Sequence, residues 1–83
     1  MSYVYILQSE KNGRFYAGST TDLDERIKKH GQGAVLSTKP YRPWKVVFRQ
    51  GFESYSDARK AELKIKRYKR RDYIIKLING DLV

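Results

Sequence analysis

Two apolar runs near the start of the chain predict a β-hairpin. Tyr3–Leu7 and Phe15–Ser19 are rich in residues that favour strands, and Asn12-Gly13 lies in the polar stretch between them. Asn-Gly between two such runs is the strongest short-range signal for a hairpin. If the numbers of paired residues sum to an odd value, as a two-residue turn would give, Tyr5 and Tyr16 share one face of the sheet. An even sum would separate the two tyrosines, and the sequence leaves both registers open.

A third strand is expected later in the chain, at Trp44–Gln50. Trp44, Val46 and Phe48 alternate there with the residues between them, which is the period of a strand whose two faces have different surroundings. Gly51 is expected to end this strand.

The first helix is expected between the second and third strands, over Asp22–His30. Thr21, with a carboxylate three residues further on, resembles the capping box that starts a helix. Gly31 suits the left-handed position after the last turn. The stretch that follows, Gly31–Pro43, carries two glycines and two prolines, so it is expected to be a loop with a short helical turn around Ala34–Thr38.

Two further helices are expected after the third strand. Ser54, with a carboxylate three residues on, is a second capping-box candidate. The apolar residues beyond it recur at the spacing of one helical stripe, namely Ala58, Ala61, Ile65 and Tyr68. Glu62 lies at the boundary of this stripe. A last helix is expected over about Asp72–Ile78, ending at Asn79-Gly80.

This order of elements predicts an α+β fold, a small three-stranded antiparallel sheet flanked by helices. The 83 residues are expected to form a single domain, residues 1–83. The chain has no cysteine, which excludes disulfides, thiolate metal sites and a cysteine nucleophile, and makes a reducing cytoplasm the expected compartment. No apolar run approaches the length of a membrane span, so a soluble protein with no membrane partner is expected.

The net charge of the chain indicates what kind of partner the protein binds. The chain carries 18 Lys and Arg against 9 Asp and Glu, a net charge of +9. Eight of these basic residues fall within one short segment that contains a single acid, Glu62: they are Arg59, Lys60, Lys64, Lys66, Arg67, Lys69, Arg70 and Arg71. This segment is expected to bind a polyanion such as nucleic acid, although a solvated helix face would give the same run. A membrane surface is disfavoured because the segment lacks a wide apolar face.

Few residues outside that segment suggest chemistry. His30 is the single histidine, so a zinc site or a serine triad is poorly supported, and there is no glycine-rich phosphate loop. Arg26 and His30 are four residues apart on the first predicted helix, where they would reach one phosphate or simply form an exposed polar face. Glu62 is either a metal ligand or a local charge partner of Lys66.

Together these residues resemble the GIY-YIG nuclease family. The first triad is Tyr3-Val4-Tyr5, ten residues separate it from the second, Tyr16-Ala17-Gly18, and Arg26, His30 and Glu62 follow in order. The pattern is most similar to the small stand-alone UPF0213 subgroup, akin to the nuclease domain of an excinuclease, on Tyr3–Leu7, Phe15–Thr20, Asp22-Leu23 with Arg26, and Glu62 with Ile65-Lys66. Tyr3 replaces the glycine of the name motif and Ala17 the isoleucine, and neither position bears the reacting group.

The resemblance implies a metal-dependent DNA endonuclease with the fold predicted above. Tyr5 would be the general base that activates water, and Tyr16 would orient that water beside it. Arg26 would lower the pKa of the phenol and hold the scissile phosphate, while His30 would contact the phosphate or assist proton transfer. Glu62 would hold one Mg²⁺ or Mn²⁺ ion.

This mechanism requires Tyr5 and Tyr16 on one face of the sheet, and hence the odd-sum register. Gly18 would leave room beside Tyr16 for the substrate, or would serve only to let the helix pack closely. Phenols on opposite faces would exclude the mechanism.

Two other classes of function stay open. A nucleic-acid-binding module would keep the fold without chemistry, or would cut only when a protein partner supplies specificity. A structural or interaction protein would not use its basic segment to bind nucleic acid. DNA is the expected partner, and the sequence leaves RNA, the shape of the substrate and the oligomeric state open.

Overall fold

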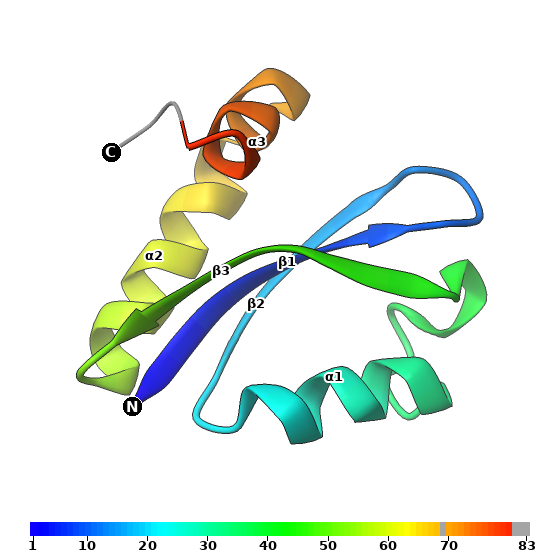
Figure 1. Ribbon diagram of the computed structural model, residues 1–83, viewed down its shortest axis with the longest axis horizontal. Helices are drawn as coiled ribbons and strands as arrows, with labels where there is room; N and C mark the ends of the chain where they lie inside the picture. The colour runs from blue at the N-terminus through cyan, green and yellow to red at the C-terminus, as the bar shows by residue number, and fades with distance from the viewer. Residues whose placement is uncertain (69, 81–83) are drawn as a thin grey trace.

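The protein folds around a three-stranded antiparallel sheet. In a computed structural model that describes residues 1–68 and 70–80, the strands are β1 (Ser2–Ser9), β2 (Phe15–Thr20) and β3 (Trp44–Phe52), in the spatial order β2-β1-β3 (Figure 1). β1 is the central strand, and its residues from Val4 to Leu7 are at most 1% exposed. β2 and β3 are the edges of the sheet.

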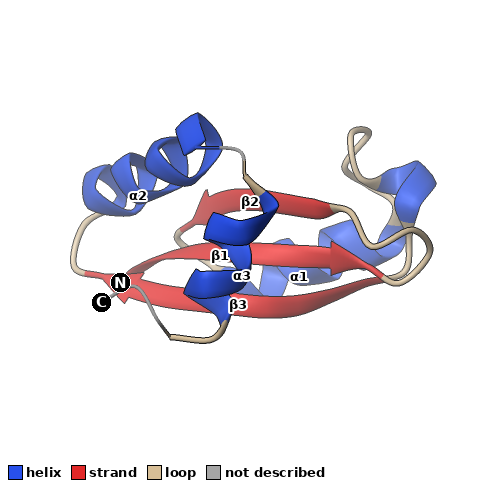
Figure 2. Cartoon of the chain, turned by 90° about the horizontal axis from the view of Figure 1, so that it is seen from above, coloured by secondary structure: helices blue, strands red, loops and turns tan. Residues whose placement is uncertain are grey.

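Helices cover both faces of this sheet. α1 (Leu23–Gln32) lies on one face, and α2 (Tyr55–Tyr68) and α3 (Arg71–Ile78) lie on the other (Figure 2). A short 3₁₀ helix, η1 (Lys39–Tyr41), interrupts the connection from α1 to β3. The predicted α+β fold and its order of elements are therefore confirmed. Within the described ranges no helix is long and apolar enough to cross a membrane.

The two faces of the sheet bury separate sets of side chains. Val4 and Ile6 pack with Ile65 of α2, whereas Tyr5 and Leu7 pack beneath α1. Successive side chains of a strand point to opposite faces, so β1 supplies the centre of both cores.

The hairpin pairs β1 with β2 in the odd-sum register. Tyr5 is the partner of Gly18, and Leu7 is the partner of Tyr16. Tyr5 and Tyr16 therefore point to the same face of the sheet, as the mechanism inferred from the resemblance requires.

The hairpin loop is wider than the two-residue turn that the sequence predicts. The backbone groups of Ser9 and Arg14 bond at 2.8 Å, so the four residues between them form the loop. The Ser9 hydroxyl accepts the backbone N–H groups of Lys11 and Asn12, which stabilises the wider loop. The two added residues, Glu10 and Lys11, both precede Asn12-Gly13, and an even number of added residues leaves the parity of the register unchanged.

α1 begins and ends later than predicted. Asp22 rather than Thr21 is the N-cap, because its carboxylate accepts a backbone N–H of the first turn. Gly33, with φ of 77°, supplies the left-handed C-cap in place of Gly31. The helix therefore extends past His30, whose side chain is buried against the sheet.

β3 departs from the simple alternation that the sequence predicts. Its register with β1 shifts beside Val47, which is an extra residue in a β-bulge. Trp44 consequently packs on the α1 face and Phe48 on the α2 face, although the alternation placed them together. The strand also runs through Gly51 instead of ending there.

α2 follows its sequence signals closely. The Ser54 hydroxyl accepts the backbone N–H of Asp57, as the predicted capping box requires. Ile65 of the predicted stripe is buried, whereas Tyr68 at its end is 49% exposed and packs against Tyr73 of α3 instead. The stripe is thus confirmed except at its last residue.

Two residues of α2 test which face of this helix is buried. Ile65 is 5% exposed and Leu63 is 50% exposed. Ile65→Ala should lower the free energy of unfolding by about 2–5 kcal/mol because it leaves a cavity in the core. Leu63→Ala should change it by less than about 0.5 kcal/mol. Urea unfolding followed by circular dichroism measures both, and equal losses would contradict the assigned face.

Candidate active site

Tyr5 reaches the edge of the sheet by lying across its neighbouring strand. Tyr5 is fully buried and is paired with Gly18 of β2. A Cβ atom on Gly18 would lie 2.5 Å from the hydroxyl oxygen of Tyr5 and 2.7 Å from its ring carbon Cζ. The space that Gly18 leaves is therefore filled by the Tyr5 phenol, and is not the free room for a substrate that the sequence suggested.

A chain of hydrogen bonds leads from Tyr5 into the protein. The Tyr5 hydroxyl lies 2.9 Å from Nε2 of His30, and Nδ1 of His30 lies 2.8 Å from the hydroxyl of Thr38. The Thr38 hydroxyl in turn donates to the carbonyl of Val35 at 3.3 Å. Tyr5, His30 and Thr38 are at most 1% exposed, and the Tyr5 hydroxyl, which lies against Gly18, is the end of the chain nearest the β2 edge.

The donors and acceptors along this chain of hydrogen bonds determine which nitrogen of His30 carries the proton. Burial, with the charge of Arg26, lowers the pKa of His30 to about 4, so its imidazole is neutral at pH 7 and carries one N–H. Thr38 gives its only proton to Val35 and so accepts Nδ1–H of His30. Nε2 is then free to accept the proton of Tyr5. The reverse direction would leave the Tyr5 hydroxyl proton without an acceptor among the described residues.

The loop between α1 and β3 holds Thr38 in place. The helical turn predicted around residues 34–38 leads directly into η1. The carbonyl of Thr38 accepts the indole N–H of Trp44 at 2.8 Å, and the carbonyl of Tyr41 accepts the hydroxyl of Ser9 at 2.6 Å. These bonds tie the loop to the start of β3 and the end of β1, which fixes the position of Thr38 behind His30.

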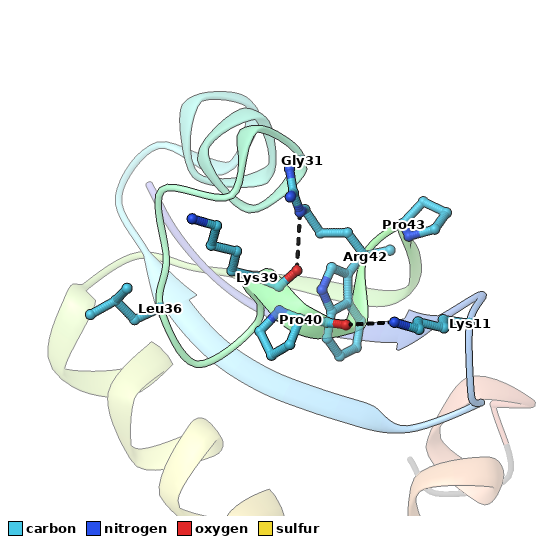
Figure 3. A pocket seen from close by; sticks show the side chains of 8 residues that line it. Lys11, Gly31, Leu36, Lys39, Pro40, Arg42 and Pro43 are labelled. Carbon is cyan, nitrogen blue, oxygen red and sulfur yellow. Dashed lines mark hydrogen bonds between the residues drawn. The ribbon is translucent and has the colours of Figure 1, made fainter.

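The outer side of the same loop borders a cavity of about 680 Å³ (Figure 3). Two cations there are engaged by the loop backbone, because Lys11 donates to the carbonyl of Pro40 at 3.3 Å and Arg42 donates to the carbonyl of Lys39 at 3.1 Å. None of the candidate catalytic side chains lines this cavity, so it lies beside the candidate site and not within it.

Arg26 and Tyr16 complete the cluster on the α1 face. Nε of Arg26 donates to the Tyr5 hydroxyl at 3.4 Å, and the ring of Tyr16 packs edge-on against His30 with centroids 5.2 Å apart. Burial raises the pKa of Tyr5 above its ordinary value, and the hydrogen bond from Arg26 offsets only part of this. The phenol is therefore protonated at neutral pH, whereas the resemblance implied a lowered pKa.

Glu62 approaches from the other face of the sheet, on α2. Its carboxylate is buried and accepts the Ser19 hydroxyl at 2.5 Å on Oε1, and Arg59 at 2.8 Å and Lys66 at 2.5 Å on Oε2. Burial alone would raise the pKa of Glu62, but the contacts with Lys66, Ser19 and Arg59 outweigh it and hold the pKa below its ordinary value. Glu62 is thus an ionised carboxylate whose buried charge is balanced by its neighbours.

The two halves of the site meet at the free edge of β2. Gly18 and Ser19 are adjacent and point to opposite faces of the sheet. Tyr5 lies over Gly18 from one side, and Glu62 bonds to Ser19 from the other. The charge of Glu62 is among the causes that raise the pKa of Tyr5, so the two groups interact across the edge. The structure therefore gathers Tyr5, Tyr16, Arg26 and His30 on the α1 face and places Glu62 at the same strand edge on the opposite face.

The basic residues expected to bind nucleic acid differ in their partners. Arg59 and Lys66 are bound to Glu62, beside the site. Arg71 lies over the ring of Phe15, 5.0 Å from its centroid, at the far end of β2. The other described members, Lys60, Lys64, Arg67 and Arg70, have exposed side chains away from Glu62, and Lys69 lies outside the described residues.

A divalent cation would have one protein ligand at this site. The described residues contain no cluster of three or more His, Cys, Asp or Glu side chains that could share a metal ion. The carboxylate of Glu62 offers about four lone-pair positions. Three of them are engaged, and two of those by the long, half-exposed side chains of Arg59 and Lys66. Mg²⁺ keeps several waters and binds through as few as one carboxylate, so an ionised Glu62 fits it.

The chain belongs to the GIY-YIG family. A family model described as the GIY-YIG catalytic domain matches residues 1–79. Domains of this family are typically endonucleases and generally use divalent metals. The class of protein that the fold and site define is thus a GIY-YIG catalytic domain, for which the family suggests nuclease activity.

Within this family, the chain is similar to UPF0213 proteins. UPF0213 protein BH0048 of Halalkalibacterium halodurans is 41% identical over 70 residues, which are 83% of this chain and 73% of the relative. UPF0213 protein SSP2268 of Staphylococcus saprophyticus is 41% identical over 71 residues, 83% and 84% of the two chains. The solution NMR structure of UPF0213 protein BH0048 from Bacillus halodurans superposes with a TM-score of 0.59 at 36% identity, covering 95% of this chain and 84% of that one. The resemblance and the fold are confirmed, and these names state no activity.

Two side chains of the site were not predicted from the sequence. Ser19 was matched only as part of a motif, and its role follows once the odd-sum register turns it toward α2. Thr38 lies in a loop with no periodicity, so no sequence signal places it behind His30. The alternative role considered for Glu62, a charge partner of Lys66, is present in the structure as well.

The buried, neutral state of His30 makes stability depend on pH. Its pKa is about 4 in the folded protein against an ordinary value of 6.5, so between these values the unfolded chain binds a proton that the folded chain does not. The free energy of unfolding should fall as pH drops from about 6.5 to about 4, by at most about 3 kcal/mol.

NMR of this single histidine measures the same property directly. The imidazole should carry its proton on Nδ1 at pH 7 and titrate with a midpoint near 4. His30→Gln should lose the corresponding part of the pH dependence of stability. A midpoint between 6 and 7 would contradict the buried Tyr5–His30–Thr38 chain.

Two glycine-to-alanine variants test the close approach of Tyr5. Gly18→Ala should push the Tyr5 hydroxyl away from His30 and destabilise the fold by about 1–3 kcal/mol, because the site is already filled. Gly31→Ala is the matched control, since its Cβ meets nothing within 4 Å and it lies in α1, where alanine is favoured by about 0.5–1 kcal/mol. Urea unfolding and the His30 ring shifts report both effects, and a neutral Gly18→Ala would refute the packing.

Proposed function

We propose that this protein is a metal-dependent DNA endonuclease that hydrolyses phosphodiester bonds at the β2 edge, in DNA repair or processing in the cytoplasm. The observation that carries the proposal is the buried hydrogen-bonded chain from Tyr5 through His30 to Thr38, placed between Arg26 and the ionised Glu62. Such a chain satisfies the buried phenol and also gives it a route by which it can pass on its proton.

Tyr5 acts as the general base by relaying a proton. The attacking water gives a proton to the Tyr5 oxygen as Tyr5 passes its own proton to Nε2 of His30. The water oxygen bonds to phosphorus, the bond from phosphorus to the 3′ oxygen breaks, and that oxygen takes a proton from solvent. The relay needs no phenolate in the resting enzyme, which agrees with the raised pKa of Tyr5.

Arg26 links substrate binding to the pKa of His30, the group that receives the proton of Tyr5. Its guanidinium donates to Tyr5, and its charge is one of the causes that lower the pKa of His30. A scissile phosphate paired with Arg26 would offset that charge, so the pKa of His30 would rise when DNA is bound. Tyr16, packed edge-on against His30, holds the imidazole and borders the position of the water.

Glu62 would hold the Mg²⁺ or Mn²⁺ ion. At that position the carboxylate would supply, through the ion it holds, neutralisation of charge on the scissile phosphate and stabilisation of the leaving 3′ oxygen. Ser19 fixes the orientation of the carboxylate, while Arg59 and Lys66 keep it ionised. The remaining basic residues of the segment from 59 to 71 would hold the DNA backbone.

A second candidate function is a nucleic-acid-binding module that does no chemistry alone, or cuts only with a protein partner that supplies specificity. The observation that favours it is the engagement of the Glu62 carboxylate by two cations, which already balance its charge and would repel a metal ion. Binding of DNA or RNA that weakens with salt, and that persists in Glu62→Ala, would accompany this function.

Nicking of supercoiled plasmid in Mg²⁺ or Mn²⁺ tests the proposed nuclease. Tyr5→Phe should lower the cleavage rate by about 100-fold or more, because it removes the group that receives the water proton. Tyr3→Phe is the matched control, on the same strand and the same face, and should cleave like the wild type. Glu62→Ala should also abolish cleavage, and Glu53→Ala, exposed at the end of β3, should not.

Each variant must first be shown to fold, by its circular dichroism and unfolding curve. A pure wild-type protein that cuts no form of DNA under either metal would overturn the proposal in favour of the binding module. Full activity in Tyr5→Phe would overturn the mechanism and leave the nuclease in place.

A further inference from the structure

A second cavity, of about 530 Å³, lies along the free edge of β2 and opens next to the candidate site. Its apolar wall is formed by Phe15 and Ala17 of β2, Ile65 of α2 and Ile74 of α3. Figure 2 shows α2 and α3 above the face of the sheet that borders this edge. The volume is within the range of about 300–1,000 Å³ that is usual for small-molecule pockets.

Three cations border this apolar wall, and among the residues that the structure describes no acid lines the cavity. Arg71 lies over the ring of Phe15 and donates to the carbonyl of Gly13 at 3.4 Å. Arg14 precedes β2, and Lys66 closes the end nearest the site. An apolar chamber with cations at its mouth matches a ligand that has a flat apolar body and phosphate groups, which is a nucleotide.

Two residues that line the cavity also contact the candidate site. Tyr16 and Lys66 line the cavity, Tyr16 also packs on His30, and Lys66 also binds Glu62. The ammonium of Lys66 lies 5.9 Å from the centroid of the Tyr16 ring, at the boundary between them. A group held in the cavity would thus be a direct neighbour of a phosphate held at Arg26 and Glu62.

We propose that this β2-edge cavity binds one unpaired nucleobase of the DNA strand, next to the scissile phosphate. The proposal rests on the proposed nuclease function and adds that the DNA strand is unpaired next to the bond that is cut. A base within a duplex has its faces stacked and its edge paired, so only an unpaired base can enter an apolar chamber. The phosphates on either side of the base lie against Arg14, Arg71 and Lys66, and the aromatic ring of Phe15 offers a surface for stacking.

Binding without metal tests the cavity independently of cleavage. The probes are fluorescein-labelled single strands of eight thymidines, and eight abasic units with the same number of phosphates, in EDTA. Fluorescence anisotropy should show the wild type binding the thymidine strand at least tenfold more tightly than the abasic strand. A duplex of the same length should also bind at least tenfold more weakly than the thymidine strand.

Adjacent isoleucines of α3 supply a matched pair of variants. Ile74→Trp fills the cavity and should bind both strands with the affinity that the wild type has for the abasic one. Ile75→Trp adds the same bulk at an exposed neighbour that does not line the cavity, and should discriminate like the wild type. Equal affinity of the wild type for the two strands, or full discrimination in a folded Ile74→Trp, would overturn the proposal.

Chemical shifts of the wild type give a test that needs no variant. Thymidine 5′-monophosphate should shift the amides of Phe15, Ala17 and Ile74, and inorganic phosphate alone should not. Shifts confined to other surfaces would overturn the cavity as the base site, and so would an apolar peptide that displaces the nucleotide at equal concentration. If the protein discriminates between the two strands but does not cut DNA, the base-binding cavity is supported and the nuclease function is overturned. If it cuts DNA but does not discriminate between the strands, the nuclease function is supported and the base-binding cavity is overturned.

Discussion

The arrangement of this protein depends on one close approach, that of the Tyr5 phenol over Gly18. Tyr5 belongs to the central strand, so an ordinary neighbour would confine its side chain to the middle of the α1 face. Because Gly18 has no Cβ, the phenol extends over β2 toward the open edge of the sheet. A buried group thereby reaches the boundary where Arg26 on one face and Glu62 on the other both approach it.

This position would be costly for a polar group without a partner, and the fold supplies one. His30 and Thr38 continue the hydrogen-bonded chain inward, and the loop that carries Thr38 is fastened to β1 and β3. A buried network is favourable only if each member is satisfied. The same requirement that stabilises the core therefore assigns the tautomer of His30 and leaves its Nε2 ready to receive a proton.

Sequence reasoning predicted the parts of this structure that local chemistry determines. The apolar stripe around Ile65 follows from residue types and short spacings, whereas the sequence leaves the parity of the hairpin open and the structure shows it by pairing Tyr5 with Gly18. The β-bulge at Val47 and the place of Thr38 depend on how distant segments pack, and no local pattern marks them. At Glu62, the sequence left a pair with Lys66 and a metal ligand as alternatives. The structure shows a carboxylate kept ionised by cations, which is also the state that a metal ion needs, so the two roles are compatible.

Three small residues in a row account for the open edge of β2. Ala17 lines the adjoining cavity with only a methyl group, and Gly18 leaves space for the ring of Tyr5. The Ser19 hydroxyl hydrogen-bonds to the carboxylate of Glu62. Proteins usually protect such an exposed strand against pairing with another chain by charged side chains, proline, a bulge or a covering element. Here the cations of α2 and α3 take over that protection, because they repel a second copy of the basic chain and attract a polyanion. The exposed edge of β2 and the basic charge beside it thus meet one requirement. A phosphate backbone must be able to lie along β2, in the place where a fourth strand could otherwise pair.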